Sequence, residues 1–339
     1  MTSTMPTKFA YTNISGKAFE HPADRAATAA LKQIPFLDVA IKKLIELGYE
    51  RSYRQFFLAN SVQIGPEQLP HTWMLFEDAM DVLDIGPYRP ELYVSQNPTR
   101  NAFTLGADRP IVVLQSGLVS MLEDRELQSV MAHELGHILS EHVMYKTALN
   151  ILLQLGNSAI GLGALPLTAL RLALLEWDRA SELSCDRCAT LMVRDPMVYS
   201  STLMKLAGGG VLEDLNLNAF IKQAEAYDEN EDYADKSLRF LLEIGTTHPF
   251  PVRRVSELLR WVRSGNYDRI LRGDYIRRGY EPPMDKEFER MVDHYSRTFN
   301  DLLGSAGKGL KGFSKDLADW LDRQNDRVNQ QRRQQEGES

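Results

Sequence analysis

The feature that most constrains this chain is the pentapeptide His-Glu-Leu-Gly-His at residues 133–137. Side chains four residues apart lie on one face of an α-helix, so His133 and His137 can bind a single metal ion if this segment is helical. The pattern predicts a long helix that brings both imidazoles and the Glu134 carboxylate close to one ion. Acidic residues precede the pentapeptide and apolar residues recur at helical spacing: Glu123, Asp124, Glu126, Leu127, Val130, Met131, Leu135, Ile138 and Leu139.

A catalytic zinc site usually has three protein ligands and a water, so the two histidines need a partner from elsewhere in the chain. Glu182 and Asp186 lie one turn apart on a later segment with a helical pattern. Glu182 can complete the ligand set, while Asp186 can hold one histidine ring from behind and fix the tautomer that binds metal. His142 follows His133 by nine positions, half a turn out of phase, and is expected to point away from the ion.

The two motifs in this order, HExxH and a later E-x-x-x-D, resemble those of the gluzincin metalloendopeptidases of the HtpX and CAAX prenyl protease family. Residues 101–106, Asn-Ala-Phe-Thr-Leu-Gly, are similar to the family's N-A-[FY]-x-x-G segment. Thr247-His248-Pro249 followed by Arg254 is similar to its T-H-P-x-x-x-x-R segment. The resemblance runs from about residue 19 to about residue 259, and Cys185 stands where the family more often has alanine.

The resemblance implies an α+β fold that is mostly helical, a zincin-like metallopeptidase fold with a small β-sheet whose edge strand lines the active-site cleft. It implies one Zn²⁺ per chain, bound by His133, His137 and Glu182. Zinc lowers the pKa of its bound water toward neutrality, and Glu134 is close enough to take the proton and later pass it to the leaving amine. We therefore expect a soluble zinc metalloendopeptidase that hydrolyses peptide bonds in peptides or unfolded proteins.

The resemblance also implies roles for four further residues. Asn101 and Ala102 are expected to offer amide and backbone hydrogen bonds to the substrate. His248 has alternative roles: it donates to the oxygen that gains negative charge, it acts as an inhibitory fourth zinc ligand, or it only caps a turn. Arg254 is expected to pair with a carboxylate behind the zinc ligands, and Asp186 is one option.

Four segments are expected along the chain. Residues 1–18 form a polar N-terminal tail, and residues 19–285 form the zincin-like metallopeptidase domain. Residues 286–324 form a C-terminal amphipathic helical extension, and residues 325–339 form a disordered polar tail. Within the domain, residues 23–84 have a largely helical pattern that is broken near Gly65 and Pro70. Two short runs are rich in β-formers: 91–95 and 110–115.

The composition of the chain limits which molecules it can bind and in which cell compartment it is expected. The formal net charge of −7 opposes a phosphate backbone, which argues against nucleic acid as a partner. Residues 1–17 contain no continuous apolar run, so no secretory signal or N-terminal anchor is expected and the predicted location is the cytoplasm. Cys185 and Cys188 could form a redox switch or a second metal site, but on a helix beside the active site we expect them to be small buried apolar residues.

Two segments raise the question of membrane contact. Residues 147–170 are uncharged, but a single crossing there would separate Glu182 from His133 by the thickness of the bilayer. We expect instead the end of the motif helix, a turn and a second buried helix, with a dip into a membrane surface as the alternative. The C-terminal helix can pack on its own domain, self-associate or make peripheral membrane contact through an apolar stripe flanked by lysines: Phe313, Leu317, Trp320, Leu321, Lys308, Lys311 and Lys315.

Two rival functions share the motif. A peptide deformylase takes a cysteine ligand from upstream of HExxH, whereas both cysteines here lie downstream. A catalytically silent scaffold or chaperone-like protein could keep zinc as a structural clamp and bind peptides without cutting them. Such a site gains nothing from Glu134, so the peptidase is the leading hypothesis. The sequence leaves the natural substrate, the cleavage preference and the oligomeric state open.

Overall fold

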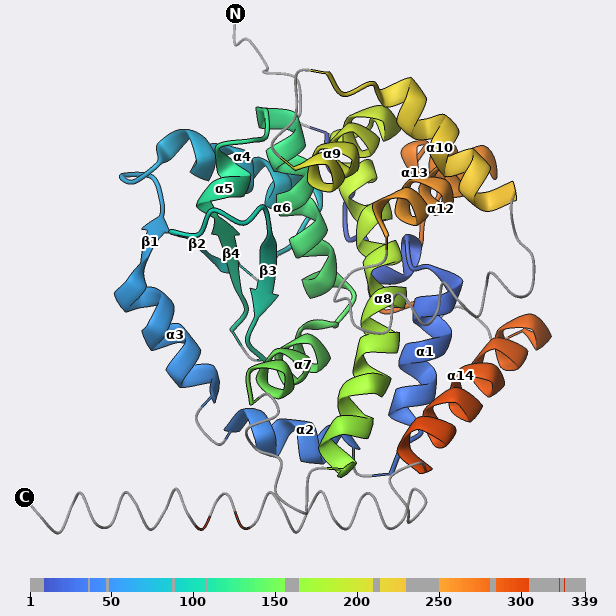
Figure 1. The fold of residues 1–339 in the computed structure, drawn as a ribbon. Helices are drawn as coiled ribbons and strands as arrows, with labels where there is room; N and C mark the ends of the chain where they lie inside the picture. Colours follow the sequence, from blue (N-terminus) through green and yellow to red (C-terminus); the bar gives the residue numbers. More distant parts are fainter. Residues whose placement is uncertain are drawn as a thin grey trace, which may run out of the picture.

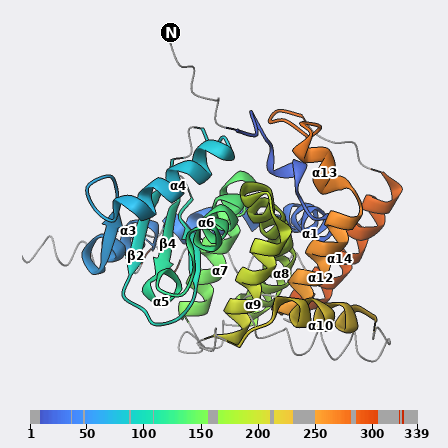
Figure 2. The ribbon, with the colours of Figure 1, turned by 90° about the horizontal axis from the view of Figure 1, so that it is seen from above.

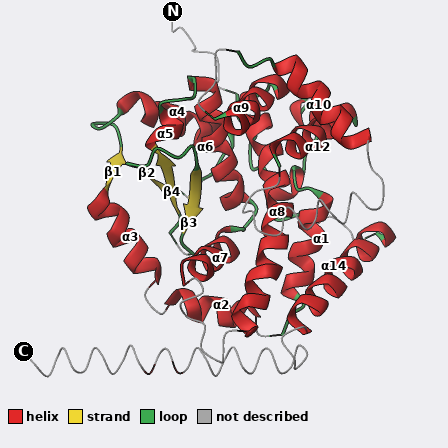
Figure 3. Ribbon diagram, in the orientation of Figure 1, coloured by secondary structure: helices red, strands yellow, loops and turns green. Residues whose placement is uncertain are grey.

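The computed structural model describes most of the chain, and these residues are mostly helical (Figure 3). The described ranges are 9–35, 37–46, 49–86, 89–107, 109–155, 165–209, 214–229, 250–280 and 285–304, with residues 323 and 326. Their elements, in chain order, are η1 (Gly16–Ala18), α1 (Pro22–Lys32), α2 (Leu37–Glu46), α3 (Tyr49–Asn60), β1 (Ser61–Ile64), α4 (Pro70–Val82), β2 (Glu91–Ser95), β3 (Ala102–Leu105), β4 (Ile111–Gln115), α5 (Ser116–Val119), α6 (Asp124–Leu139), α7 (Val143–Leu155), α8 (Leu165–Val193), α9 (Pro196–Gly208), α10 (Leu217–Glu229), α12 (Pro251–Arg263), α13 (Asn266–Leu271) and α14 (Lys286–Gly304).

The elements are arranged in layers. The small sheet stands on one side of the molecule and helices α1 and α14 on the other, with α6, α7 and α8 between them (Figure 1). Seen from above, the order is the same, with α4 beside the sheet and α12 beside α1 and α14 (Figure 2). The predicted α+β fold, mostly helical with a small sheet, is confirmed.

The sheet has four strands in the order β1-β2-β4-β3, in which β2 and β4 are parallel and the two outer pairs are antiparallel. β4 is buried from residue 111 to residue 114, which explains its uninterrupted apolar sequence. β3 forms one edge and packs against α6 and α7. The edge strand therefore lies beside the helix that carries the HExxH motif. The sequence pattern missed β3, and it assigned β1 to a helical region, which is wrong.

Helix α6 has a defined start and a sharp end. It begins with a capping box in which the side chains of Glu123 and Glu126 each accept a hydrogen bond from the other residue's backbone N–H. It ends at Leu139, because Glu141 has a φ of 60°, in the left-handed region. The prediction that residues 147 onward continue the motif helix is therefore wrong, since α7 is a separate helix.

Four clusters of buried apolar residues lie among the described residues, and α8 passes through the two largest. The cluster on the sheet side includes residues such as Val112, Met131, Leu135, Leu191 and Val255. The cluster among the helices includes residues such as Leu31, Ile41, Leu149, Leu174 and Phe299. The first half of α8 belongs to the second cluster and residues 188–193 belong to the first. Between them, residues 181–187 are buried but carry mostly polar side chains, which need partners inside the protein.

Helices α6 and α8 approach closely where Gly136 faces the two cysteines. A Cβ at residue 136 would lie 3.0 Å from the Cβ of Cys188 and 3.3 Å from the Cα of Cys185. Both cysteines are buried and free. Their small side chains allow the two helices to come together, which agrees with the interpretation of these residues as small apolar packing groups.

None of the described helices is long and apolar enough to cross a membrane. Helix α14 packs against α1 and α8, so the start of the predicted C-terminal extension contacts the rest of the domain. The apolar stripe expected at residues 313–321 lies outside the described residues, as do residues 156–164. Membrane contact or self-association through that stripe stays a prediction.

Candidate metal centre

The three predicted ligands meet where α6 and α8 cross. Nε2 of His133 lies 3.2 Å from Oε2 of Glu182, and Nε2 of His137 lies 3.2 Å from Oε1 of the same carboxylate. All three side chains are buried. In a tetrahedral zinc site with Zn–N bonds of about 2.0–2.1 Å, neighbouring donor atoms stand roughly 3.3 Å apart. The spacing therefore fits one small cation among the three side chains.

The chemistry of these donors also fits a cation. Within the part of the chain that the structure describes, the buried Nε2 of His137 has no hydrogen-bond partner. Burial and the nearby Lys146 lower the pKa of His137 well below its usual value, so the ring stays in the neutral form that binds metal. Burial alone would lower the pKa of His133, but Glu182 and Asp186 raise it to about 9.

Cys185 is a second candidate donor. Its sulfur and one nitrogen each of His133 and His137 all lie within 4.8 Å of one another. Burial and the charge of Glu182 raise the pKa of the Cys185 thiol well above its usual value in the metal-free protein. Glu182 contacts both rings at 3.2 Å, so the geometry and the charge favour the carboxylate as the third ligand.

Behind His133 lie three side chains, which we call the His133 arm: Asp186, Tyr199 and Arg254. Nδ1 of His133 is 3.2 Å from Oδ1 of Asp186 and 3.0 Å from the Tyr199 hydroxyl on α9. Tyr199 donates a hydrogen bond to Asp186 at 2.6 Å, and Arg254 on α12 donates to the same carboxylate through Nε at 2.9 Å. Burial alone would raise the pKa of Asp186, but Arg254 and His133 lower it to about 2. The structure thus brings Arg254 onto Asp186.

Behind His137 lie His142 and Asp24, which we call the His137 arm. Nδ1 of His137 is 3.1 Å from Nδ1 of His142, and Nε2 of His142 is 3.0 Å from Oδ2 of Asp24 on α1. The expectation that His142 points away from the site is wrong, because His142 is not on α6. The left-handed residue Glu141 turns the chain out of the helical path, and the His142 N–H donates to the His137 carbonyl at 2.9 Å.

Two more buried side chains hold the carboxylates of the site. The Thr104 hydroxyl on β3 donates a hydrogen bond to Oε2 of Glu134 at 2.7 Å. Nζ of Lys146 on α7 lies 2.9 Å from Oε1 of Glu182 and 2.9 Å from Oδ1 of Asp178. Burial alone would lower the pKa of Lys146, but the two carboxylates raise it, so the ammonium group stays charged.

Sequence reasoning did not identify several of these residues: Asp24, Thr104, Lys146, Asp178 and Tyr199. Only Lys146 had a local signal, because it is the one charged residue in the sequence of α7. Of the predicted substrate-binding residues, Asn101 is exposed just before β3, and Ala102 is buried within that strand. His248 lies outside the described residues, so its alternative roles stay predictions.

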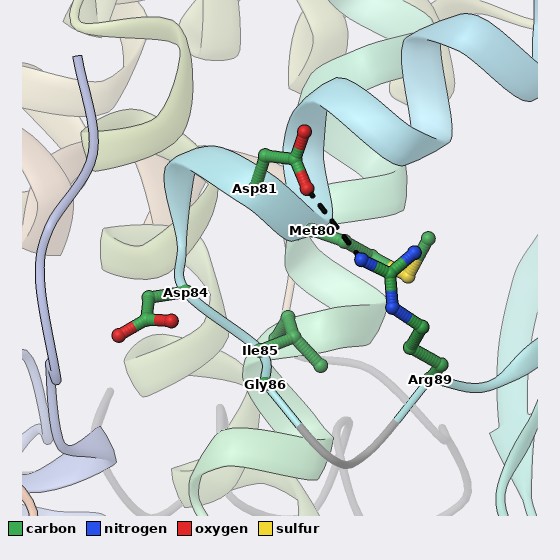
Figure 4. Close-up of a pocket in the computed structure, with 6 residues that line it drawn as sticks. All are labelled: Met80, Asp81, Asp84, Ile85, Gly86 and Arg89. Carbon is green, nitrogen blue, oxygen red and sulfur yellow. Dashed lines mark ion pairs between the residues drawn. The ribbon is translucent and has the colours of Figure 1, made fainter. Parts of the chain in front are cut away.

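A surface pocket lies at the C-terminal end of α4 and shares no lining residue with the metal centre (Figure 4). Its lining residues are Met80, Asp81, Asp84, Ile85, Gly86 and Arg89. Nη2 of Arg89 lies 3.9 Å from Asp81, and Arg278 pairs with Asp84 at 2.8 Å. Its acidic side chains are therefore engaged by arginines, and the pocket does not compete with the buried histidine cluster as a candidate catalytic site.

The arrangement described above is that of a metallopeptidase of the zincin class: a helix carrying HExxH lies beside the edge strand of a small sheet, and a second helix brings a glutamate against both histidines. Comparison with known families agrees. Residues 70–262 match the model of Peptidase family M48, and the chain belongs to this family.

Two relatives illustrate the membership. The chain is 35% identical over 267 residues to the plastoglobule-localized metallopeptidase 48, chloroplastic, of Arabidopsis thaliana, with 77% of each chain covered. It is 28% identical over 180 residues to the protease HtpX homolog of Tropheryma whipplei strain TW08/27, which covers 44% of this chain and 61% of that relative. No solved structure matches the chain. The resemblance to the HtpX-like proteases is confirmed, and the family supports a metal-dependent peptidase.

Proposed function

We propose that this chain is a zinc metalloendopeptidase that hydrolyses peptide bonds in peptides or unfolded proteins. The observation that carries the proposal is the single carboxylate of Glu182, 3.2 Å from the Nε2 atoms of both His133 and His137. These three side chains would hold the zinc ion. Family membership and the protease names of the relatives support the reaction class.

The residues around the ligands suit this chemistry. When bound, zinc supplies a Lewis acid that polarises water and the scissile carbonyl. Glu134 follows His133 on α6, and Thr104 holds its carboxylate in place. Glu134 takes a proton from the attacking water and passes it to the leaving amine. Asn101 and Ala102, at the start of the edge strand β3, would align an extended substrate through backbone hydrogen bonds.

The reaction also needs a donor for the carbonyl oxygen as it becomes negative. His248 is the proposed donor, and its rival role is that of an inhibitory fourth ligand. The variant His248→Gln distinguishes the two: a donor loses activity, whereas an inhibitory ligand gains it when replaced. The measurement is the initial rate on an unfolded substrate at saturating zinc.

The experiment that tests the whole proposal compares zinc-loaded protein with a Glu134→Gln variant on unfolded casein. We expect the variant to bind zinc normally and to cleave about 10²–10⁴-fold more slowly, because the base is lost. Glu141→Gln is the matched control, since this exposed glutamate lies just after α6 and should be replaceable. If wild-type protein binds zinc and peptide but cuts nothing, the scaffold function is the correct one.

The cellular location also stays a proposal. The sequence favours the cytoplasm, with peripheral membrane contact as the alternative. The name of the Arabidopsis relative places that protein at plastoglobules of the chloroplast. Fractionation of cells that produce the full chain, with and without a high-salt wash, tests whether it is soluble or held at a membrane surface.

A further inference from the structure

The His137 arm links a metal ligand to the first long helix of the chain. From His137 the contacts run to His142 at 3.1 Å and from His142 to Asp24 at 3.0 Å. All three side chains are buried. Asp24 lies on α1, before residue 70, where the match to the family model begins. The arm therefore joins the HExxH helix to a segment outside the matched range.

The protons of this arm have one consistent arrangement when Nε2 of His137 is a metal ligand. Nδ1 of His137 then carries the hydrogen, and Nδ1 of His142 faces it and must accept. The hydrogen of His142 is therefore on Nε2, which faces the Asp24 carboxylate. His137 thus presents a hydrogen to His142. Nε2 of His142 lies 3.0 Å from the negatively charged Asp24 carboxylate, although among the described residues this nitrogen has no partner with hydrogen-bond geometry.

Neighbouring side chains fix the position of Asp24. Oδ2 accepts a hydrogen bond from the Ser184 hydroxyl on α8, and Oδ1 accepts one from Thr28 at 3.2 Å. Ser184 in turn accepts from the His21 backbone N–H at 2.8 Å, which ties the start of α1 to the helix that carries Glu182. The indole of Trp177 packs edge-on against the His142 ring, with centroids 5.5 Å apart. Contacts with neighbouring side chains thus hold both Asp24 and His142 in place.

We propose that His142 and Asp24 are positioning residues for the metal ligand His137, and that helix α1 is therefore a working part of the metal centre. This inference rests on the proposed zinc site. A hydrogen bond to the second ring nitrogen fixes the orientation of a ligating histidine and raises its basicity, and loss of such a partner typically weakens metal binding about 10–100-fold. Asp24 acts only through His142, so the two residues form one unit.

The test measures zinc release from the purified full chain to a chromophoric chelator. We expect His142→Phe to release zinc about 10–100-fold faster than wild type, because His137 loses its acceptor. Asp24→Asn should change the rate in the same direction by a smaller factor. The double variant should match His142→Phe alone, since a residue that acts through His142 has no effect once that ring is gone. Lys32→Gln is the matched control, because it changes an exposed side chain at the end of the same helix α1.

Two further measurements separate positioning from a general loss of structure. The visible spectrum of the cobalt-substituted protein should change in His142→Phe and stay as in wild type in Lys32→Gln. Thermal unfolding in a chelator reports folding, and His142→Asn replaces the phenylalanine variant if that one does not fold. A folded variant at position 142 that releases zinc within twofold of the wild-type rate overturns the proposal, as does an additive double variant. Casein cleavage by wild type reports the proposed function separately: a chain that binds zinc but does not cut refutes the peptidase and leaves the release rates to decide the arm.

Discussion

His133 and His137 lie one turn apart on α6, yet the side chains behind them come from different parts of the chain. The His133 arm joins α8, α9 and α12, and its carboxylate has a guanidinium partner. All its residues lie within the matched range, 70–262. The His137 arm runs from the turn after α6 to α1, outside that range. One ligand is thus supported by the scaffold that the family model covers, and the other by a helix that precedes it.

The largest effect is expected from breaking the charge pair of the His133 arm. Arg254→Met leaves Asp186 as a buried carboxylate without its guanidinium partner, which should cost about 3–5 kcal/mol of unfolding free energy. The measurement is urea unfolding in the presence of a chelator. Arg260→Met is the matched control on the same helix, because its ion pair with Glu257 is half exposed and should contribute less than about 1 kcal/mol. Equal losses in the two variants would contradict the buried-pair account.

The next largest effect is a loss of unfolding free energy at low pH, caused by protonation of Asp186. The pKa of Asp186 is about 2 in the folded protein, below its ordinary value of 3.8. A carboxyl with a depressed pKa stabilises the fold fully above its unfolded pKa and loses that contribution as the pH falls through its folded pKa. We expect roughly 2 kcal/mol to disappear between about pH 4 and pH 2.

Chelator-treated protein titrated with urea at each pH provides the measurement for this acid effect. The double variant Asp186→Asn with Arg254→Met removes both charges of the pair and should lose less stability over the same pH interval. A fall as steep as that of wild type would show that other carboxyls, Asp24 of the His137 arm among them, account for the acid sensitivity.

A smaller effect is expected from a substitution at Thr104, which leaves the His133 arm and the His137 arm intact. Thr104→Val removes the hydroxyl that holds Glu134, and we expect kcat to fall about tenfold with little change in KM. Zinc release should match wild type, because no ligand loses a partner. Thr104→Ser should restore most of the rate. If the valine variant also loses zinc, Thr104 supports the metal site as a whole and not only the base.

The smallest effect is expected at Cys185, whose sulfur lies near both ligating rings. Cys185→Ala should lower the unfolding free energy by about 1 kcal/mol, as for loss of a small packing group, and leave zinc affinity within about twofold. The measurements are unfolding and competition with a chelator of known affinity. A large loss of zinc would make the thiol a ligand and would move the third donor from Glu182 to Cys185.

The sequence predicted the parts of the site that depend on local spacing. The four-residue interval of HExxH placed His133 and His137 on one helical face, and the same interval placed Glu182 and Asp186 together. What it missed depends on turns and on distant contacts. The sequence placed His142 on the wrong side because it extended the helical spacing of α6 beyond the end of that helix. The left-handed residue Glu141 turns the chain out of the helix just before His142.

The residues that the sequence did not predict share one property: each reaches the site only through a contact that forms in the folded protein. Asp24 is 118 positions before His142 in the chain, and only the packing of α1 against α8 brings it to the site. Tyr199 and Thr104 are ordinary residues of a helix and a strand, and their contacts with Asp186 and Glu134 exist only in the folded protein. The fold class itself was predictable, but β1 and β3, with four residues each, were too short to show a pattern.

Helix α8 links the two largest apolar clusters to the metal centre, because Glu182 lies between its two buried halves. Melting of either cluster would displace this helix and separate the glutamate from the histidines on α6. A cation held by the three proposed ligands would then lose its carboxylate.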